Sequence, residues 1–161
     1  MAEIKTNVMR ILEQKKIPYQ AHSYPHGEEP VDGATVARLL GQDPRQVYKT
    51  LVARGHSKNY YVFVIPVEST LDLKKAAKAA AEKSVEMIHV KDITAITGYV
   101  RGGCSPLGMK KQFPTVIHES AEAYPEIYVS GGRIGTSIKV EPQALAKLAR
   151  AKFDDIIRKA E

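Results

Sequence analysis

Three short segments of the sequence hold residues whose types and spacing could support chemistry: 47–50 (VYKT), 102–108 (GGCSPLG) and 130–135 (SGGRIG). All three fall in predicted loops or at strand edges. Glycine there lets the backbone approach a ligand and present amide N–H groups to an anion or a polarised carbonyl. A single Gly-Gly pair, taken alone, is more typical of an ordinary turn, because turns use glycine routinely.

Lys49 is the candidate catalytic cation of this set. It lies just inside a predicted strand with apolar neighbours, where its stem can be buried and its ammonium directed into a cleft. Partial burial would lower its pKa, and such a lysine could polarise an ester carbonyl, hold a phosphate or carboxylate, or act as a base. Spacing alone favours a surface lysine, since most lysines are solvated.

Cys104 is the only cysteine, so the chain forms no internal disulfide. A thiol in a glycine-rich loop could be a nucleophile, but the sequence identifies no base for it. His22 and His26 are four residues apart with Pro25 between them, which argues against a helical metal pair. We therefore expect a quiet, partly buried thiol, no metal site and no cofactor.

These segments must be positioned by a set of helices and strands. Apolar periodicity predicts helices over residues 1–15, 33–40, 70–83, 92–98 and 142–157, and strands over 19–24, 49–53, 60–67, 85–90, 115–118, 127–130 and 137–140. Asp92 is expected to cap one helix, and Asp43 and Gln46 to form a capping box in a turn of their own. The lysines of 70–83 are expected to form a solvated face. The fold class predicted is α+β: one domain, 1–161, with a mixed, mostly antiparallel sheet or partial barrel flanked by helices.

Composition limits the class of protein. The chain has 161 residues, of which 43% are hydrophobic and 26% charged, as in a folded domain with its own core. Lys and Arg exceed Asp and Glu by 24 to 18, a net charge of +6 that favours a polyanionic partner or simply aids solubility. No apolar stretch reaches the roughly 18 residues that cross a bilayer, so we expect a cytoplasmic protein with no membrane partner.

Four motifs in order resemble those of the YbaK/EbsC family: 47–51 (VYKTL), 71–75 (LDLKK), 102–111 (GGCSPLGMKK) and 127–132 (IYVSGG). That family in turn resembles the editing insertion domain of bacterial prolyl-tRNA synthetases. The resemblance spans nearly the whole chain and implies a YbaK-like fold. It implies a free-standing trans-editing deacylase that removes cysteine from tRNA(Pro) without a metal or cofactor. The thiol of the substrate itself would attack the ester, and prolyl-tRNA synthetase is a candidate partner.

The resemblance also implies site residues, and Lys49 matches the essential lysine of the family. It would contact the terminal adenosine or the aminoacyl ester of the tRNA 3′ end, and two glycine-containing walls would place backbone groups near the reacting carbonyl. The catalytic residues implied are Lys49, Gly102, Ser130 and Gly132, and the substrate-binding residues are Tyr24, Thr50, Gly103, Ser105, Gly131, Arg133 and Ser137.

Two departures from the family pattern bear on specificity. Residues 29–32 (EPVD) stand where many relatives have an aromatic residue, and Ser137 stands where a pocket aspartate is expected. Another acid, Glu68 among the candidates, would have to hold the substrate ammonium. The alternative functions are therefore a deacylase for Ala-tRNA(Pro) or another mischarged tRNA, and a regulator that binds tRNA or a nucleotide without catalysis.

Overall fold

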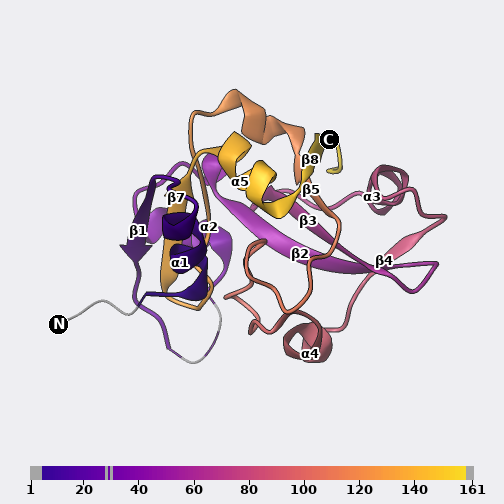
Figure 1. Ribbon diagram of the computed structural model, residues 1–161, viewed down its shortest axis with the longest axis horizontal. Helices are drawn as coiled ribbons and strands as arrows, with labels where there is room; N and C mark the ends of the chain where they lie inside the picture. The colour runs from indigo at the N-terminus through magenta and orange to yellow at the C-terminus, as the bar shows by residue number, and fades with distance from the viewer. Residues whose placement is uncertain (1–4, 28, 30, 159–161) are drawn as a thin grey trace.

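The computed structural model describes residues 5–27, 29 and 31–158 (Figure 1). Its elements are, in order, α1 (Asn7–Gln14), β1 (Tyr19–Ser23), α2 (Gly33–Leu39), η1 (Pro44–Gln46), β2 (Tyr48–Gly55), β3 (Tyr60–Pro66), α3 (Leu73–Ala79), β4 (Val85–Met87), η2 (Val90–Asp92), α4 (Ile93–Thr97), β5 (Thr115–His118), η3 (Glu119–Ala123), β6 (Ile127–Ser130), β7 (Thr136–Val140), α5 (Pro142–Ala149) and β8 (Lys152–Asp154). None of the helices in this part of the chain is long and apolar enough to cross a membrane.

The strands form two sheets. The larger has the order β4-β2-β3-β5-β8, with β2 antiparallel to β3 and β4, and β5 parallel to β3 and β8. The smaller, β1-β7-β6, is antiparallel throughout. A single bridge between Val47 and Tyr128 joins them. The sheets do not close into a barrel, and the predicted α+β fold with a mixed sheet flanked by helices is confirmed.

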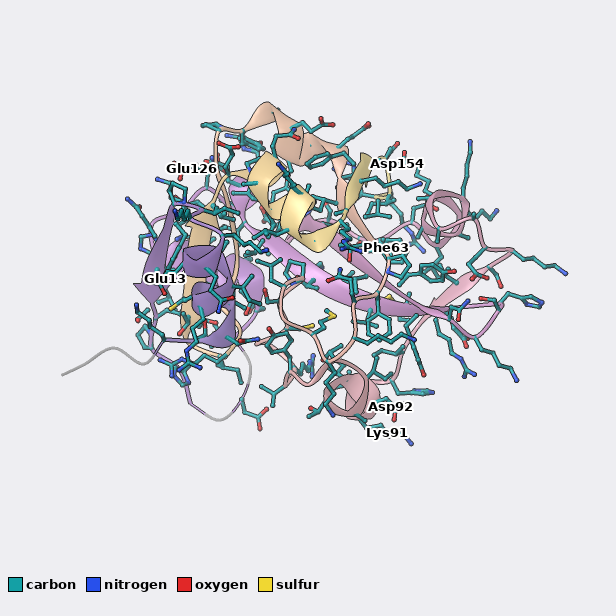
Figure 2. All side chains as sticks on the ribbon, in the orientation of Figure 1. Glu13, Phe63, Lys91, Asp92, Glu126 and Asp154 are labelled. Carbon is teal, nitrogen blue, oxygen red and sulfur yellow. The ribbon has the colours of Figure 1, made fainter. Side chains whose placement is uncertain are left out.

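Strand β3 is buried on both faces, which explains its unbroken apolar run. Val62 and Val64 face a cluster that includes residues of α1 and α5, whereas Phe63 and Ile65 face a second cluster built on α3. Successive side chains of a strand point to opposite faces, so a strand covered on both sides must be apolar at every position. Figure 2 shows Phe63 in the middle of the molecule, and its exposed fraction is 0%.

The caps at two helix starts differ from the prediction. Asp43 accepts a hydrogen bond from Arg45 N, but Gln46 completes no capping box; its Nε2 donates to Glu126 O at 3.3 Å and ties η1 to the segment before β6. Asp92 makes no capping hydrogen bond. Its backbone (φ −95°, ψ −8°) already continues from η2, whereas a capping side chain requires an extended backbone.

Three predicted helices are too long. The helix predicted over 1–15 begins at Asn7, after Thr6 as its N-cap, and residues 1–4 of that prediction lie outside the described residues. α5 ends at Ala149, since Arg150 takes a left-handed conformation (φ 54°, ψ 40°), and residues 152–154 form β8 beside β5. Phe153 pairs with Ile117 there, so the apolar residues that seemed to extend a helical stripe belong to a strand. α3 covers only Leu73–Ala79, and one of its lysines, Lys75, is ion-paired with Asp155 instead of solvated.

Candidate functional site

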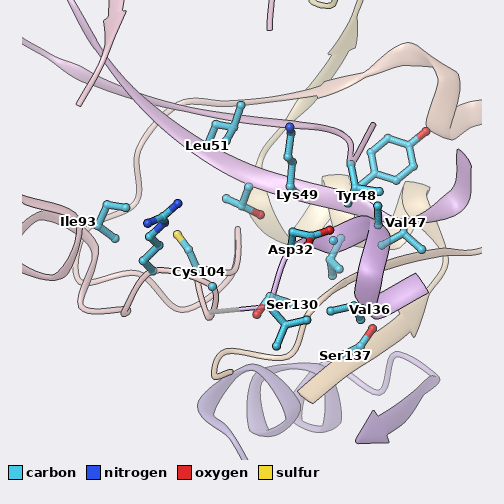
Figure 3. A pocket seen from close by; sticks show the side chains of 18 of the residues that line it. Asp32, Val36, Val47, Tyr48, Lys49, Leu51, Ile93, Cys104, Ser130 and Ser137 are labelled. Carbon is cyan, nitrogen blue, oxygen red and sulfur yellow. The ribbon is translucent and has the colours of Figure 1, made fainter. Parts of the chain in front are cut away.

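A cavity of about 420 Å³ lies where the two sheets meet. Its wall combines the start of α2, the first half of β2, residues 87–93, the loop at 101–104 and the adjoining ends of β6 and β7 (Figure 3). Cavities of roughly 300–1,000 Å³ are the size that binds small molecules and cofactors. This is therefore the candidate site, and all three sequence segments contribute to its wall: 47–50 with all four residues, 102–108 with Gly102 and Cys104, and 130–135 with Ser130.

The cavity follows an unpaired stretch of the edge of β2. Val67 N donates to Val47 O and Gly55 N donates to Asn59 O, so the odd-numbered residues of β2 exchange hydrogen bonds with β3. The peptide groups of even-numbered residues therefore face the other edge. β4 pairs with this edge from Ala53 to Gly55, and Ile88 N donates to Val52 O at 3.3 Å, so the edge is uncovered before Val52. The peptide of Thr50 lies on the uncovered stretch, where its N–H and C=O are available to a ligand.

Lys49 projects from this uncovered half of β2. Figure 3 shows its side chain on the same side of the strand as that of Leu51, with Ser130 on the opposite wall. Burial lowers the pKa of the ammonium below its usual 10.5. Within the described chain it has neither an ion pair nor a hydrogen bond, so its charge is open to a substrate.

The hydroxyl of Thr50 is the second open polar group. Its Oγ1 is buried and has no hydrogen-bond partner among the described residues. A buried hydroxyl without a partner costs about 1–3 kcal/mol of stability, so such groups are rare unless a ligand satisfies them. Together with Lys49, it gives the cavity a charged donor and a neutral one on consecutive residues.

The structure brings six of the predicted site residues to the wall of the cavity. They are Tyr24, Lys49, Thr50, Gly102, Ser130 and Ser137. Tyr24 is only 8% exposed, Gly102 has a φ of 85°, and the Oγ of Ser130 accepts a hydrogen bond from Gly132 N at 3.2 Å.

The other predicted glycines lie behind the wall and shape it. A Cβ at Gly103 would come within 2.8 Å of the Arg133 Cα, and Gly131 N donates to Thr136 O at 2.8 Å. Gly132 has a φ of 101° and donates to the Ser130 hydroxyl. These residues allow the turn and the loop to pack closely, which is a supporting role for the cavity.

The last two predicted residues are also engaged outside the cavity. Ser105 is fully buried, and its Oγ accepts a hydrogen bond from Leu107 N at 3.3 Å. Arg133 is exposed, and its Nε donates to the Thr136 Oγ1 at 3.0 Å.

Cys104 lines the cavity and is partly buried, as expected. Burial raises the pKa of its thiol to about 11, against a smaller opposing effect of a hydrogen bond with Thr97. At neutral pH the sulfur is therefore protonated, and a protonated thiol is a poor nucleophile.

Sequence reasoning missed two charged residues of the wall, Asp32 and Arg101. Asp32 is the only acidic residue among those described there, whereas Glu68 does not reach the cavity. The Asp32 carboxylate accepts hydrogen bonds from the Thr35 N at 2.9 Å and Oγ1 at 2.8 Å, which lower its pKa. Its capping position, three residues before a threonine, was the available signal.

One cluster outside the cavity has the composition of a metal site. His118, Glu119 and Asp155 place one ligand atom each within 4.8 Å of one another. Asp155 already accepts a hydrogen bond from the Lys75 ammonium at 2.8 Å, and His118 Nε2 lies 3.4 Å from its carboxylate. These contacts account for the cluster as an ion-paired link between α3, β5 and the segment after β8.

The fold and sequence are those of a class of domains that edit aminoacyl-tRNA. Residues 28–148 match the aminoacyl-tRNA editing domain, and the chain belongs to this family. The chain is 46% identical over 155 residues to EbsC of Enterococcus faecalis (strain ATCC 700802 / V583), which is named as a Cys-tRNA(Pro)/Cys-tRNA(Cys) deacylase. The alignment covers 96% of this chain and 94% of that protein.

Solved structures agree on the fold. A crystal structure titled as a trans-editing enzyme for prolyl-tRNA synthetase has a TM-score of 0.82 and 22% identity, covering 98% of this chain and all of the other. The hypothetical protein APE2540 has a TM-score of 0.84 and 21% identity, covering 94% of this chain and 99% of its own. The sequence-based assignment to the YbaK/EbsC family is confirmed.

Proposed function

We propose that this protein is a trans-editing deacylase that removes cysteine from mischarged tRNA(Pro) in the cytoplasm. The observation that carries the proposal is the pair formed by Lys49 and Thr50, a half-buried unpaired ammonium beside a buried unpaired hydroxyl, on the uncovered edge of β2. Membership in the editing-domain family and the name of the EbsC relative support the aminoacyl ester as substrate.

The reaction needs no nucleophile from the protein. The thiol of the bound cysteine attacks its own ester carbonyl: the S–C bond forms, the ester C–O bond breaks, and the thiol proton ends on the ribose oxygen of the released tRNA. The products are a thiolactone, which water opens, and a free tRNA 3′ end. The protonated state of Cys104 is consistent with this route.

The side chains of the cavity supply position and charge. Negative charge develops on the carbonyl oxygen during the attack, and the Lys49 ammonium stabilises it. The Thr50 hydroxyl and peptide bind the ribose or the ester, and Ser130, Gly102 and the aromatic ring of Tyr24 confine the aminoacyl group. Holding the substrate thiol beside the ester carbonyl accelerates the intramolecular attack, and no catalytic nucleophile of the protein is needed.

Asp32 holds the ammonium of the substrate in this proposal. It is the only carboxylate that the described wall offers, and Ser137, at the position where relatives are expected to carry aspartate, has no charge. A carboxylate has about four lone-pair sites, so Asp32 can bind an ammonium while it caps α2. If Asp32 binds the substrate ammonium, an aspartate at position 137 is not needed. A cysteinyl substrate is then compatible with Ser137, where this sequence departs from the family pattern.

The direct test is deacylation of Cys-tRNA(Pro), Ser-tRNA(Pro) and Ala-tRNA(Pro) by the purified protein. We expect rapid loss of cysteine and at least about 100-fold slower loss of serine, which has the same shape but a far weaker internal nucleophile. Equal rates for serine and cysteine would contradict attack by the substrate thiol. Preferential loss of alanine would assign the alternative substrate, and binding without turnover would assign a regulator.

We propose that prolyl-tRNA synthetase, as a partner of this protein, selects tRNA(Pro). Phosphate contacts carry no sequence information, and the name of the EbsC relative includes two different tRNAs. Addition of the synthetase is expected to raise the rate ratio of Cys-tRNA(Pro) over Cys-tRNA(Cys). An unchanged ratio would place tRNA selection within this chain.

A further inference from the structure

The described cavity wall includes one exposed cationic side chain and two exposed apolar side chains, besides the partly buried Lys49 and Thr50. Arg101 from the loop after α4, and Met87 and Val90 from the β4–η2 segment, all line the wall. We propose that Arg101 binds the phosphate that joins the last two nucleotides of the tRNA, while Met87 and Val90 bind the face of a terminal base. This assignment rests on the proposed function and specifies how its substrate is held.

The two cations of the cavity differ in their exposure to solvent. Lys49 and Arg101 are the only Lys or Arg residues on the described wall; Lys49 is partly buried and Arg101 is exposed. The 3′ end of a charged tRNA presents its groups in a matching order, with the ester innermost, the ribose next and the first phosphate outermost. A planar guanidinium suits a phosphate because it donates two parallel hydrogen bonds, whereas an ammonium acts as a point charge.

The backbone of Arg101 is held by a tight turn. Gly103 N donates to Val100 O at 3.0 Å, which closes a four-residue turn with Arg101 in its second position. Gly102 occupies the third position with a φ of 85°, where glycine is favoured, and Gly103 packs directly against the backbone of Arg133. The turn therefore fixes the backbone position from which the Arg101 side chain reaches the cavity wall.

The apolar side chains of Met87 and Val90 on the same wall favour a nucleotide over a free anion as the ligand. Met87 is 42% and Val90 is 54% exposed, although both belong to the cavity wall. Exposed apolar side chains grouped at a cavity are typical of binding surfaces, and every base has an apolar face. A cation on the same cavity wall as these apolar side chains matches the phosphate and the base of one nucleotide.

The test compares two short substrates that differ by one phosphate: 3′-O-cysteinyl-adenosine, which has none, and cysteinyl-CpA, which has the phosphate in question. For Arg101→Ala we expect the KM for cysteinyl-CpA to rise about tenfold with kcat nearly unchanged, because a phosphate contact contributes binding away from the reacting atoms. The same variant should process cysteinyl-adenosine like the wild type. Arg101→Lys should recover part of the loss.

The matched control is Arg54→Ala, which removes the same charge from the far end of β2, outside the cavity. It should leave both substrates unaffected. Equal losses of Arg101→Ala on both substrates, or none on either, would overturn the phosphate assignment while wild-type turnover upholds the proposed function. If the wild type turns over only full-length Cys-tRNA(Pro), the slope of log KM against log salt must fall by about 1 in Arg101→Ala, and an unchanged slope overturns the assignment.

Discussion

The two ends of β2 have opposite surroundings. From Ala53 to Gly55 the strand is paired on both edges, with β3 on one side and β4 on the other. From Lys49 to Leu51 it is paired with β3 alone, and its other edge faces the cavity. One strand thus supplies a rigid ladder at one end and open polar groups at the other. A strand fixed in this way can present a ligand site without the mobility of a loop.

The polar and charged side chains around the two ends of β2 also differ in their hydrogen bonds. At the covered end, the Glu82 carboxylate accepts hydrogen bonds from the hydroxyls of Ser57 and Tyr61 and from the Ser57 N at 3.1 Å. At the open end, Lys49 and the Thr50 hydroxyl have no partner within the described chain. Under the proposed function, we therefore expect the covered end to contribute stability and the open end to contribute binding and catalysis.

The largest effect on activity is expected for Lys49→Ala. Because Lys49 is proposed to stabilise the carbonyl oxygen, removing its charge should lower kcat/KM for Cys-tRNA(Pro) by about 10²–10³-fold. The measurement is single-turnover deacylation, with circular dichroism to confirm folding. Arg54→Ala, a charge removal on the covered half of the same strand, should retain wild-type activity. A comparable loss in both variants would erase the distinction between the two ends.

Thr50→Val separates binding from stability at the open end. Loss of the hydroxyl should lower kcat/KM about tenfold, while the free energy of unfolding stays equal or rises, because the hydroxyl has no partner to lose. Thr115→Val is the control, since the Thr115 Oγ1 donates to Phe113 O at 2.9 Å. That variant should lose about 1 kcal/mol of stability in urea denaturation and no activity. The reverse pattern would refute a ligand-binding role for Thr50.

Gly55→Ala perturbs the covered end. A Cβ there would overlap the Glu82 carboxylate and displace it from Ser57 and Tyr61. We expect a loss of about 1 kcal/mol in the free energy of unfolding and no change in deacylation. Gly27→Ala, at an exposed position where nothing lies within 4 Å of the added Cβ, provides the comparison. Reduced activity at full stability would show that the covered end also takes part in catalysis.

The smallest effect is a stability gain in Lys49→Met. Burial lowers the pKa of Lys49 in the folded state, so between that value and 10.5 the unfolded chain binds more protons than the folded one. The cost of burying the charge is therefore fully present below the lowered pKa and disappears as the pH rises from that pKa to 10.5. Lys49→Met should have a higher melting temperature than the wild type at pH 7 and a shrinking advantage at higher pH. A constant difference, as expected for the exposed Lys74→Met, would contradict this origin.

The sequence predicted the elements well where local signals agree with the fold. The apolar, β-rich runs at 49–53 and 60–67 predicted the two strands that pair as β2 and β3, and Gly98, which follows α4 with a φ of 88°, was predicted as the end of that helix. The predicted helix through Ile157 failed because a partner strand decided the outcome: β5 offers its edge to residues 152–154. Periodicity within one segment contains no information about a distant edge.

The site was predicted in part for a similar reason. Lys49 and Ser130 came from motifs, and the structure places both on the cavity wall. Glycine motifs do not distinguish a residue that faces a ligand, such as Gly102, from one that allows close packing behind it, such as Gly103. Asp32 escaped notice because its place on the wall depends on how α2 meets β2 in three dimensions.

The most direct test of the account is an NMR titration of the protein with a stable substrate analogue, 3′-cysteinylamino-3′-deoxyadenosine, in which an amide replaces the ester. We expect the largest amide shifts at Lys49, Thr50 and Ser130, and no change at Arg54 and Gly55. Shifts centred on the covered end of β2, or saturation without any shift at Thr50, would contradict the claim that the uncovered edge of this strand holds the aminoacyl end of the tRNA.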